Sequence, residues 1–161
     1  MRILFVCLGN ICRSPTAEGV MRHKLREAGL GADVDVESAG TGGWHVGHAP
    51  DERATAAAAA REIELEGAAR RFEPSDFEDF DLILAMDRKN LEDMRALAPH
   101  AAAEGRLGLL REYDPLAVDA GDLEVPDPYY GGEDGFEHVL DVVDRACDGL
   151  LREIEEQLAR S

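Results

Sequence analysis

Lysine, cysteine and long apolar runs are all scarce in this 161-residue sequence, and each scarcity excludes a class of protein. Only two residues are lysine, and 34 acidic residues against 17 basic ones give a formal net charge of −17. A surface this acidic argues against nucleic-acid or anionic-membrane partners, because both need basic patches. Every apolar run is shorter than the roughly 18 residues that span a bilayer. The first run ends at Gly9, which is too early for a signal peptide.

Cysteine usage indicates the cellular compartment. The three cysteines lie at positions 7, 12 and 147, an odd number at spacings that do not fit a disulfide framework. The sequence also has no Cys-x-x-C pair or Cys/His cluster that would indicate zinc. A chain of this length buries enough surface to fold without cross-links. The sequence therefore predicts a protein of a reducing, cytoplasmic compartment with no metal site.

Strand and helix signals alternate along the chain and predict one α/β domain over residues 1–161. Continuous apolar runs are typical of strands buried on both faces of a parallel sheet. The expected strands are 2–8, 34–36, 81–86 and 107–110, and the expected helices are 14–29, 51–65, 75–80, 88–98 and 136–159. Ser14 and Asp87 are the expected N-caps of the first and fourth helices. This order predicts an open parallel sheet with helices on both faces and a ligand site beyond the carboxyl ends of the strands.

The C-terminal part combines an expected loop with an expected core helix. Residues 114–135 are rich in glycine, proline and acidic residues, which predicts a long surface loop of the kind that is usually functional. In the last helix, apolar residues recur at helical spacing and include Cys147. Cys147 is therefore expected in the core, without a chemical role.

The loop between the first strand and the first helix has the residues needed to bind an anion and to activate a thiol. Gly9 and Asn10 permit the backbone angles that turn N–H groups inward, which forms an anion nest at a helix N-terminus. Arg13 can clamp two phosphate oxygens. Cys7 lies at the bottom of this positive cup, where its thiolate is favoured and the Ser14 hydroxyl can donate to the sulfur. The sequence predicts Cys7 as a nucleophile toward a phosphoryl group.

The alternative interpretation of this loop is a tight strand–helix turn around a buried core cysteine. A chance match to Cys-x5-Arg followed by Ser or Thr is expected in about one per cent of sequences of this composition. A plain turn also leaves the clustering of glycine, asparagine and arginine unexplained. The phosphate-loop hypothesis is therefore favoured.

A second segment, residues 125–130, supplies a candidate general acid. Asp127 lies between two prolines that stiffen the backbone, and Tyr129 and Tyr130 follow it. Phosphoryl transfer from a phenol needs a proton for the leaving group, which Asp127 can supply. The two tyrosines can flank an aromatic leaving group. The alternative is an acidic surface turn in an acidic protein, but the nearby presence of the Cys7 loop in the fold would favour catalysis.

Motifs spread over nearly the whole chain resemble those of the low-molecular-weight protein tyrosine phosphatases, in family order. They are Val6–Pro15, Ser38–Thr41, Trp44–Gly47, Met86–Asp87 with Asn90–Leu91, and Asp127–Tyr129. The resemblance implies a flavodoxin-like sheet of order 2-1-3-4 and no metal or other cofactor. It implies that phosphotyrosine proteins are the substrates, with inorganic phosphate or other oxyanions as product or inhibitor.

The resemblance also implies roles for individual residues. Cys7 would be the nucleophile, Arg13 the phosphate clamp and Asp127 the general acid. The phosphate-binding residues would be Leu8, Gly9, Asn10, Ile11, Cys12, Arg13 and Ser14, with the Asn10 side chain holding the strained loop. Cys12 matches a second loop cysteine that can form a reversible disulfide with the nucleophile and protect it from over-oxidation. The alternative role for Cys12 is loop packing.

Around the loop, the resemblance places Trp44, Tyr129 and Tyr130 on the pocket wall. For Trp44 the alternative is a cover over the sheet edge, and His45 and His48 are expected only as surface loop residues. Asp87 would both cap its helix and steady the phosphate loop.

One position departs from the family pattern. Many members have a histidine in the network behind the loop where this chain has Gly67. This departure puts the hydrogen bonding behind the loop in question, and leaves the residues of the loop itself intact.

Three other functions remain as alternatives. Protein arginine phosphatases of the same family tend to have threonine at the position of Ile11, whose branched apolar side chain should narrow the pocket to suit a phenyl ring. Thiol-dependent arsenate reductases need further cysteines in mid-chain, and none occurs between residues 13 and 146. A regulator that binds phosphate without turnover would not need Cys7, Arg13 and Asp127 together.

Overall fold

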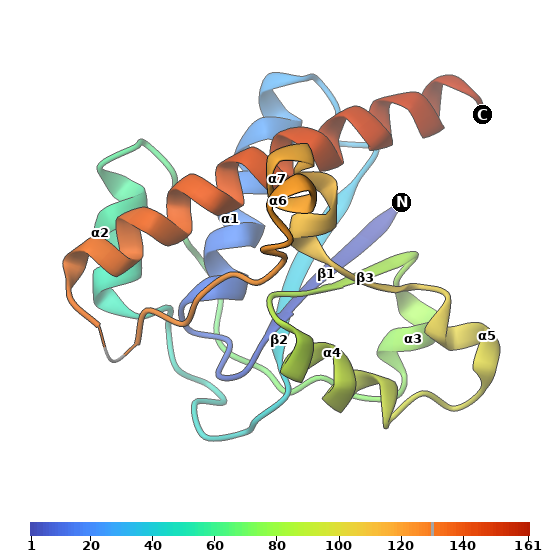
Figure 1. Cartoon of the computed structure of the whole chain (residues 1–161), viewed down its shortest axis with the longest axis horizontal. Coiled ribbons are helices and arrows are strands. Elements are labelled where there is room, and N and C mark those ends of the chain that lie inside the picture. Colours follow the sequence, from blue (N-terminus) through green and yellow to red (C-terminus); the bar gives the residue numbers. More distant parts are fainter. Residues whose placement is uncertain (130) are drawn as a thin grey trace.

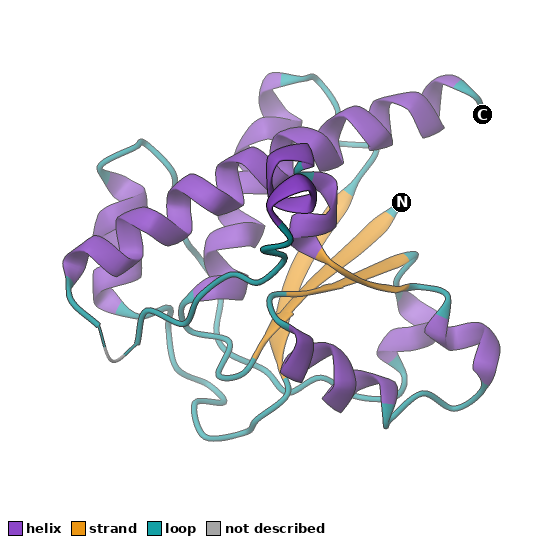
Figure 2. Ribbon diagram, in the orientation of Figure 1, coloured by secondary structure: helices purple, strands orange, loops and turns teal. Residues whose placement is uncertain are grey.

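Four parallel strands form the centre of the molecule, with helices on both sides (Figure 2). The computed structural model describes residues 1–129 and 131–161, so Tyr130, an expected pocket-wall residue, lies outside the described residues. In chain order the elements are β1 (Arg2–Cys7), α1 (Arg13–Glu27), β2 (Asp35–Gly40), α2 (Glu52–Ala59), α3 (Asp76–Asp79), β3 (Leu82–Ala85), α4 (Arg88–Arg95), α5 (Ala101–Glu104), β4 (Leu107–Leu109), the 3₁₀ helix η1 (Leu110–Tyr113), α6 (Pro115–Ala120) and α7 (Glu133–Ala159).

The strand order is β2-β1-β3-β4, and every pairing is parallel, so the predicted architecture is confirmed. The central strand β1 pairs with β2 and β3 on its two sides, and Leu4 aligns with Glu37 and with Ile83. Its apolar run is fully buried because both faces of the sheet are covered. Since parallel strands end at one edge, this topology places the loop after Cys7 beside the ends of β2 and β3.

Two hydrophobic clusters separate the faces of the sheet. Helices α1, α2 and α7 cover one face, and α3, α4 and α5 cover the other (Figure 1). The predicted apolar face of α7 is buried, and Cys147 lies in the larger cluster, fully enclosed. Burial raises the pKa of the Cys147 thiol, which keeps it neutral.

Two expected elements differ most from the structure. The long loop predicted at 114–135 is wrong in its first part, where Asp114 caps α6 by accepting from the Leu116 N–H and Gly121 ends it in a left-handed conformation. The helix predicted over 51–65 ends at Ala59, because the chain turns at Glu62, which has a φ of 63°. That turn buries Ile63 against the core.

Helix α7 approaches η1 so closely at Gly149 that no side chain fits between them. A Cβ atom there would lie 1.8 Å from the Tyr113 carbonyl oxygen. Although Gly→Ala is usually stabilising within a helix, we expect Gly149→Ala to lower the free energy of unfolding by about 1–3 kcal/mol through overpacking. Urea unfolding followed by circular dichroism measures this difference.

The matched control is Gly135→Ala in the same helix, where a Cβ would lie 3.4 Å from the Pro128 Cβ, an ordinary contact. This variant should keep or slightly raise the free energy of unfolding. Equal effects of the two substitutions would contradict the packing argument.

Of the helices in the described ranges 1–129 and 131–161, none is both long and apolar enough to cross a membrane.

Candidate active site

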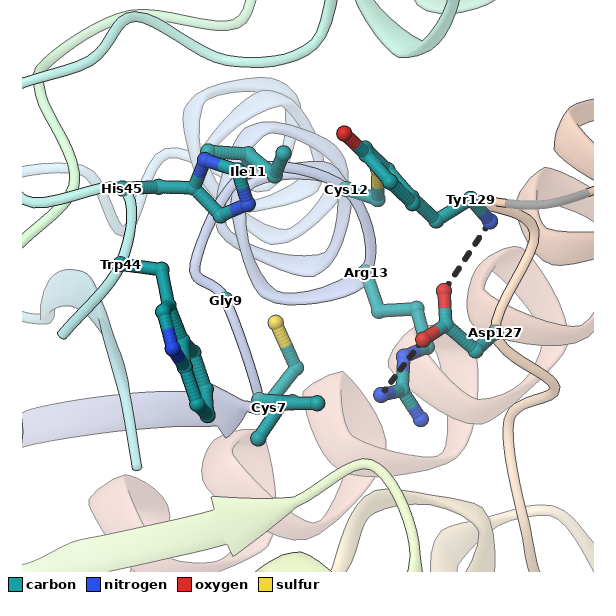
Figure 3. Close-up of a pocket in the computed structure, with 10 residues that line it drawn as sticks. Cys7, Gly9, Ile11, Cys12, Arg13, Trp44, His45, Asp127 and Tyr129 are labelled. Atoms are coloured by element: carbon teal, nitrogen blue, oxygen red, sulfur yellow. Dashed lines mark hydrogen bonds and ion pairs between the residues drawn. The ribbon is translucent and has the colours of Figure 1, made fainter. Parts of the chain in front are cut away.

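The loop between β1 and α1 surrounds the sulfur of Cys7 at the bottom of a cavity of about 480 Å³. Asn10 adopts a left-handed conformation, with a φ of 57°, as expected for this loop. Its backbone N–H points at the Cys7 Sγ at 3.3 Å, and the Ser14 hydroxyl lies 3.0 Å from the same sulfur. The sulfur faces into the cavity (Figure 3). The loop therefore presents donors to a sulfur atom that a ligand can reach.

The side chain of Asn10 fixes the shape of the loop from behind. Its Nδ2 donates to the hydroxyls of Ser14 and Ser38, at 2.9 Å each, and its Oδ1 accepts from the Arg70 backbone N–H at 2.9 Å. The Ser38 hydroxyl in turn donates to the Glu18 carboxylate at 2.6 Å. Because Ser14 accepts from Asn10, its own proton can be donated to the Cys7 sulfur at 3.0 Å, and the Ala39 carbonyl, at 3.4 Å, is its more distant acceptor.

The predicted role of Ser14 as a helix cap is wrong. Helix α1 begins at Arg13 with Cys12 at the N-cap position, two residues before the expected cap. Ser14 lies in the first turn, fully buried, where its hydroxyl contacts the Cys7 sulfur. Serine is a preferred N-cap residue, but here its contact with the sulfur places it inside the first turn.

Arg13 lines the cavity, and an ion pair and a hydrogen bond to a backbone carbonyl hold its guanidinium in place. Its Nη1 donates to the Asp87 Oδ2 at 2.6 Å and to the Val125 carbonyl at 3.1 Å. Burial alone would lower the pKa of Arg13, but the neighbouring Cys7 and Asp87 raise that pKa above its usual value. The guanidinium therefore stays charged. Asp87 also accepts from the Asn90 N–H at the start of α4, so it both caps the helix and holds Arg13.

Asp127 reaches the mouth of the same cavity from the segment before α7 (Figure 3). Its Oδ2 lies 3.7 Å from the Arg13 Nη2, and its Oδ1 accepts from the Tyr129 N–H at 3.0 Å. The Val125 N–H donates to the Met86 carbonyl at 2.7 Å, which attaches this segment to the end of β3. The structure thus brings together Cys7, Arg13 and Asp127, which are up to 120 positions apart in the sequence.

Aromatic side chains form the walls of the cavity. Trp44 and Tyr129 line it, and Trp44 is 73% exposed, which excludes the alternative that it covers the sheet edge. His45 also lines it, with its ring centroid 6.0 Å from that of Tyr129. We did not expect this histidine in the wall; its position next to Trp44 is the only signal in the sequence.

Arg53, which sequence reasoning also missed, contacts Tyr129. It donates to the Tyr129 carbonyl at 3.0 Å, and its guanidinium lies over the rings of Tyr129 and Phe136. An arginine in an acidic protein carries no sequence signal for this position, because the contact joins segments 76 positions apart.

The second loop cysteine, Cys12, also lines the cavity and is buried. Burial, followed by the charges of Asp51, Cys7 and Asp127, raises the pKa of Cys12 to about 12. Cys12 is therefore a neutral thiol at physiological pH. All three cysteines, which belong to the described residues, are free thiols.

Gly67, the departure from the family pattern, lies behind the loop. It has a φ of 89° and lines a small cavity of about 170 Å³ together with Asn10, Glu18 and Ser38. The Arg70 N–H and the Glu18 carboxylate complete the hydrogen bonding of Asn10 and Ser38 there.

Comparison with known proteins agrees with this geometry. The family model for low molecular weight phosphotyrosine protein phosphatase matches residues 2–160. A low molecular weight protein-tyrosine-phosphatase of Streptomyces coelicolor is 51% identical over 157 residues, covering 98% of this chain and 95% of the relative.

Solved structures give the same result. A protein tyrosine phosphatase of Entamoeba histolytica superposes with a TM-score of 0.92 at 37% identity, covering 98% of each chain. A Drosophila arginine phosphatase superposes with a TM-score of 0.88 at 31% identity, covering 96% of this chain and 98% of that one. The chain belongs to the low-molecular-weight protein-tyrosine-phosphatase family.

Proposed function

We propose that this protein hydrolyses phosphotyrosine in proteins, and small aryl phosphates, through a cysteinyl-phosphate intermediate. One observation carries the proposal. The Cys7 sulfur lies at the floor of a cavity, with N–H and O–H donors directed at it, a charged guanidinium beside it and a carboxylate at the mouth. Cys7, Arg13 and Asp127 are the catalytic residues in this proposal.

In the first step, the Cys7 thiolate attacks the phosphorus atom. An S–P bond forms while the bond from phosphorus to the phenolic oxygen breaks, and Asp127 gives its proton to the departing phenolate. The phosphate oxygens lie against the loop from Leu8 to Ser14 and the Arg13 guanidinium, which stabilise the charge as the group is transferred. Asp87 positions that guanidinium through the 2.6 Å contact.

In the second step, a water molecule attacks the phosphorus of the intermediate. Asp127, now a carboxylate, accepts a proton from the water, the S–P bond breaks and inorganic phosphate leaves. The Ser14 hydroxyl and the Asn10 N–H stabilise the thiolate that is released. The two steps restore the starting protonation of both Cys7 and Asp127.

The shape of the cavity favours a phenyl ring as the group that leaves. Trp44 and Tyr129 present flat rings, and Ile11 of the phosphate loop adds a branched apolar surface to the wall. Phosphoarginine is the second candidate substrate, since a similar solved structure is that of an arginine phosphatase. The apolar side chain of Ile11 can pack against a phenyl ring but offers no hydrogen-bond partner to the N–H groups of a guanidinium.

Phosphotyrosine and phosphoarginine peptides of the same sequence, assayed side by side, test this proposal. We expect kcat/KM to favour phosphotyrosine by at least about tenfold, the usual discrimination of a shaped apolar pocket. Ile11→Thr should reduce this ratio. Equal or faster turnover of phosphoarginine would make the protein an arginine phosphatase. Absence of turnover of both would instead favour a regulator that only binds phosphate.

The same proposal places the protein in the cytoplasm. Its catalytic thiol and the neighbouring Cys12 thiol both need reducing conditions to stay free. An arsenate reductase relay is disfavoured because Cys147, the only cysteine beyond the loop, is enclosed in the core.

A further inference from the structure

A second surface cavity, of about 500 Å³, lies directly beside the catalytic one. Leu8 and Trp44 line both cavities, and the second is completed by residues 41–43, Arg71 and Asp93. A molecule bound in the catalytic cavity therefore has an adjoining hollow into which its neighbouring atoms can extend. The mechanism proposed above makes no use of this hollow.

Backbone hydrogen bonds fix the walls of the second cavity relative to the phosphate loop. The Gly42 N–H donates to the Leu8 carbonyl at 2.9 Å, which connects the two loops. Arg71 forms a parallel bridge with Gly40 at the end of β2, and the flanking Phe72 N–H donates to the Gly40 carbonyl at 2.7 Å. The backbone of Arg71 is thus attached by hydrogen bonds to the end of β2.

The guanidinium of Arg71 is available to bind a ligand in the second cavity. Arg71 is exposed, and among the residues that the structure describes it has no carboxylate within 4 Å. Its neighbour Arg70 is paired with Asp76 at 3.0 Å, and Asp93 in the cavity wall is paired with Lys89 at 2.6 Å. In a protein with twice as many acidic as basic residues, an arginine without an acidic partner in a cavity wall points to an anionic ligand.

We propose that the second cavity is a substrate subsite, in which Arg71 binds the carboxylate of an aspartate or glutamate that flanks the phosphotyrosine in the substrate protein. The inference rests on the proposed function and names its substrate class. Trp44 and Leu8 contact the apolar part of the flanking chain, and the guanidinium pairs with its acidic group. Local recognition by Arg71 offsets the long-range repulsion that a protein of net charge −17 exerts on an acidic peptide.

The test uses pairs of phosphotyrosine peptides that differ by a single Asp-to-Asn exchange within three residues of the phosphotyrosine. We expect the Asp peptide to exceed its Asn partner in kcat/KM by about 1.5- to 5-fold at one position at low salt, the usual range for an exposed ion pair. The ratio should fall toward one in high salt. The ratio should also fall to about one in Arg71→Gln. In Arg71→Glu the preference should reverse, so that a peptide with lysine at that position is turned over faster than the Asp peptide.

The matched control is Arg152→Gln, which removes the same charge from α7, outside both cavities. It should keep the wild-type ratio. Turnover of the peptides without an Asp preference, or a preference that survives in Arg71→Gln, would overturn this proposal and leave the proposed function standing. Failure to turn over any of the phosphotyrosine peptides would overturn both.

Discussion

Replacing Cys7 by serine is expected to abolish turnover of p-nitrophenyl phosphate, with kcat lowered by roughly 10⁴–10⁶, as is typical for loss of a catalytic nucleophile. A serine hydroxyl is a far weaker nucleophile than a thiolate. A base would be needed to remove its proton, but the groups around this position are hydrogen-bond donors. The Asn10 N–H and the Ser14 hydroxyl both point toward the sulfur, an arrangement that stabilises an anion and accepts no proton from a hydroxyl. Steady-state release of p-nitrophenol measures the loss.

Binding of inorganic phosphate shows whether Cys7→Ser loses turnover through lost chemistry or through a damaged site. Trp44 is the only tryptophan and lines the cavity, so its fluorescence can report binding of inorganic phosphate. Cys7→Ser should still bind phosphate, because the loop amides and Arg13 remain. As a matched control, Cys147→Ala removes a thiol from the core and should keep its turnover number. More than a few per cent of residual kcat in Cys7→Ser would eliminate the thiolate mechanism.

The phosphate loop could be predicted from sequence because its geometry is local. The seven residues from the last of a buried strand to the first of a helix, Cys7 to Arg13, are enough to set the positions of the thiol, Asn10 and the guanidinium. The error there concerned Ser14, where a general preference for caps competed with a specific contact to the sulfur. Local rules place the loop, and the contacts between its side chains decide the details.

The contacts across the site depend on how the strands are ordered, which local patterns do not contain. Asp87 meets Arg13 across 74 positions because β1 and β3 are neighbours in the sheet. His45 enters the cavity wall only because the loop after β2 folds over the phosphate loop. Helix α6 was missed for a different reason, since the acidic, proline-rich composition of its surroundings outweighed the capping signals at Asp114 and Gly121.

Asp127→Asn is the second substitution with a large expected effect, a loss of about 10²–10⁴ in kcat/KM for phenyl phosphate. Phenolate leaves slowly without a proton, whereas p-nitrophenolate is a stable anion and leaves with less help, so the loss should shrink for p-nitrophenyl phosphate. The geometry supports this role. The Tyr129 N–H engages the Asp127 Oδ1 at 3.0 Å, and Oδ2 lies on the side of Arg13, toward the phosphate site.

The leaving-group dependence distinguishes a proton donor from a positioning residue. Asp127 is also close enough to Arg13, at 3.7 Å, to influence where the guanidinium lies. If that were its only contribution, Asp127→Asn would lower kcat/KM, which reports the first step and not the common second step, by the same factor for every aryl phosphate, because the phosphoryl group is common to all of them. A proton donor instead produces a loss that grows with the basicity of the leaving phenolate.

Asp119→Asn, on α6, makes the same change of charge away from the cavity and should leave kcat unchanged for every substrate in the series. A uniform loss of kcat/KM in Asp127→Asn would assign Asp127 to the support of Arg13 in the first step, and the proton for the leaving group would then have to come from solvent.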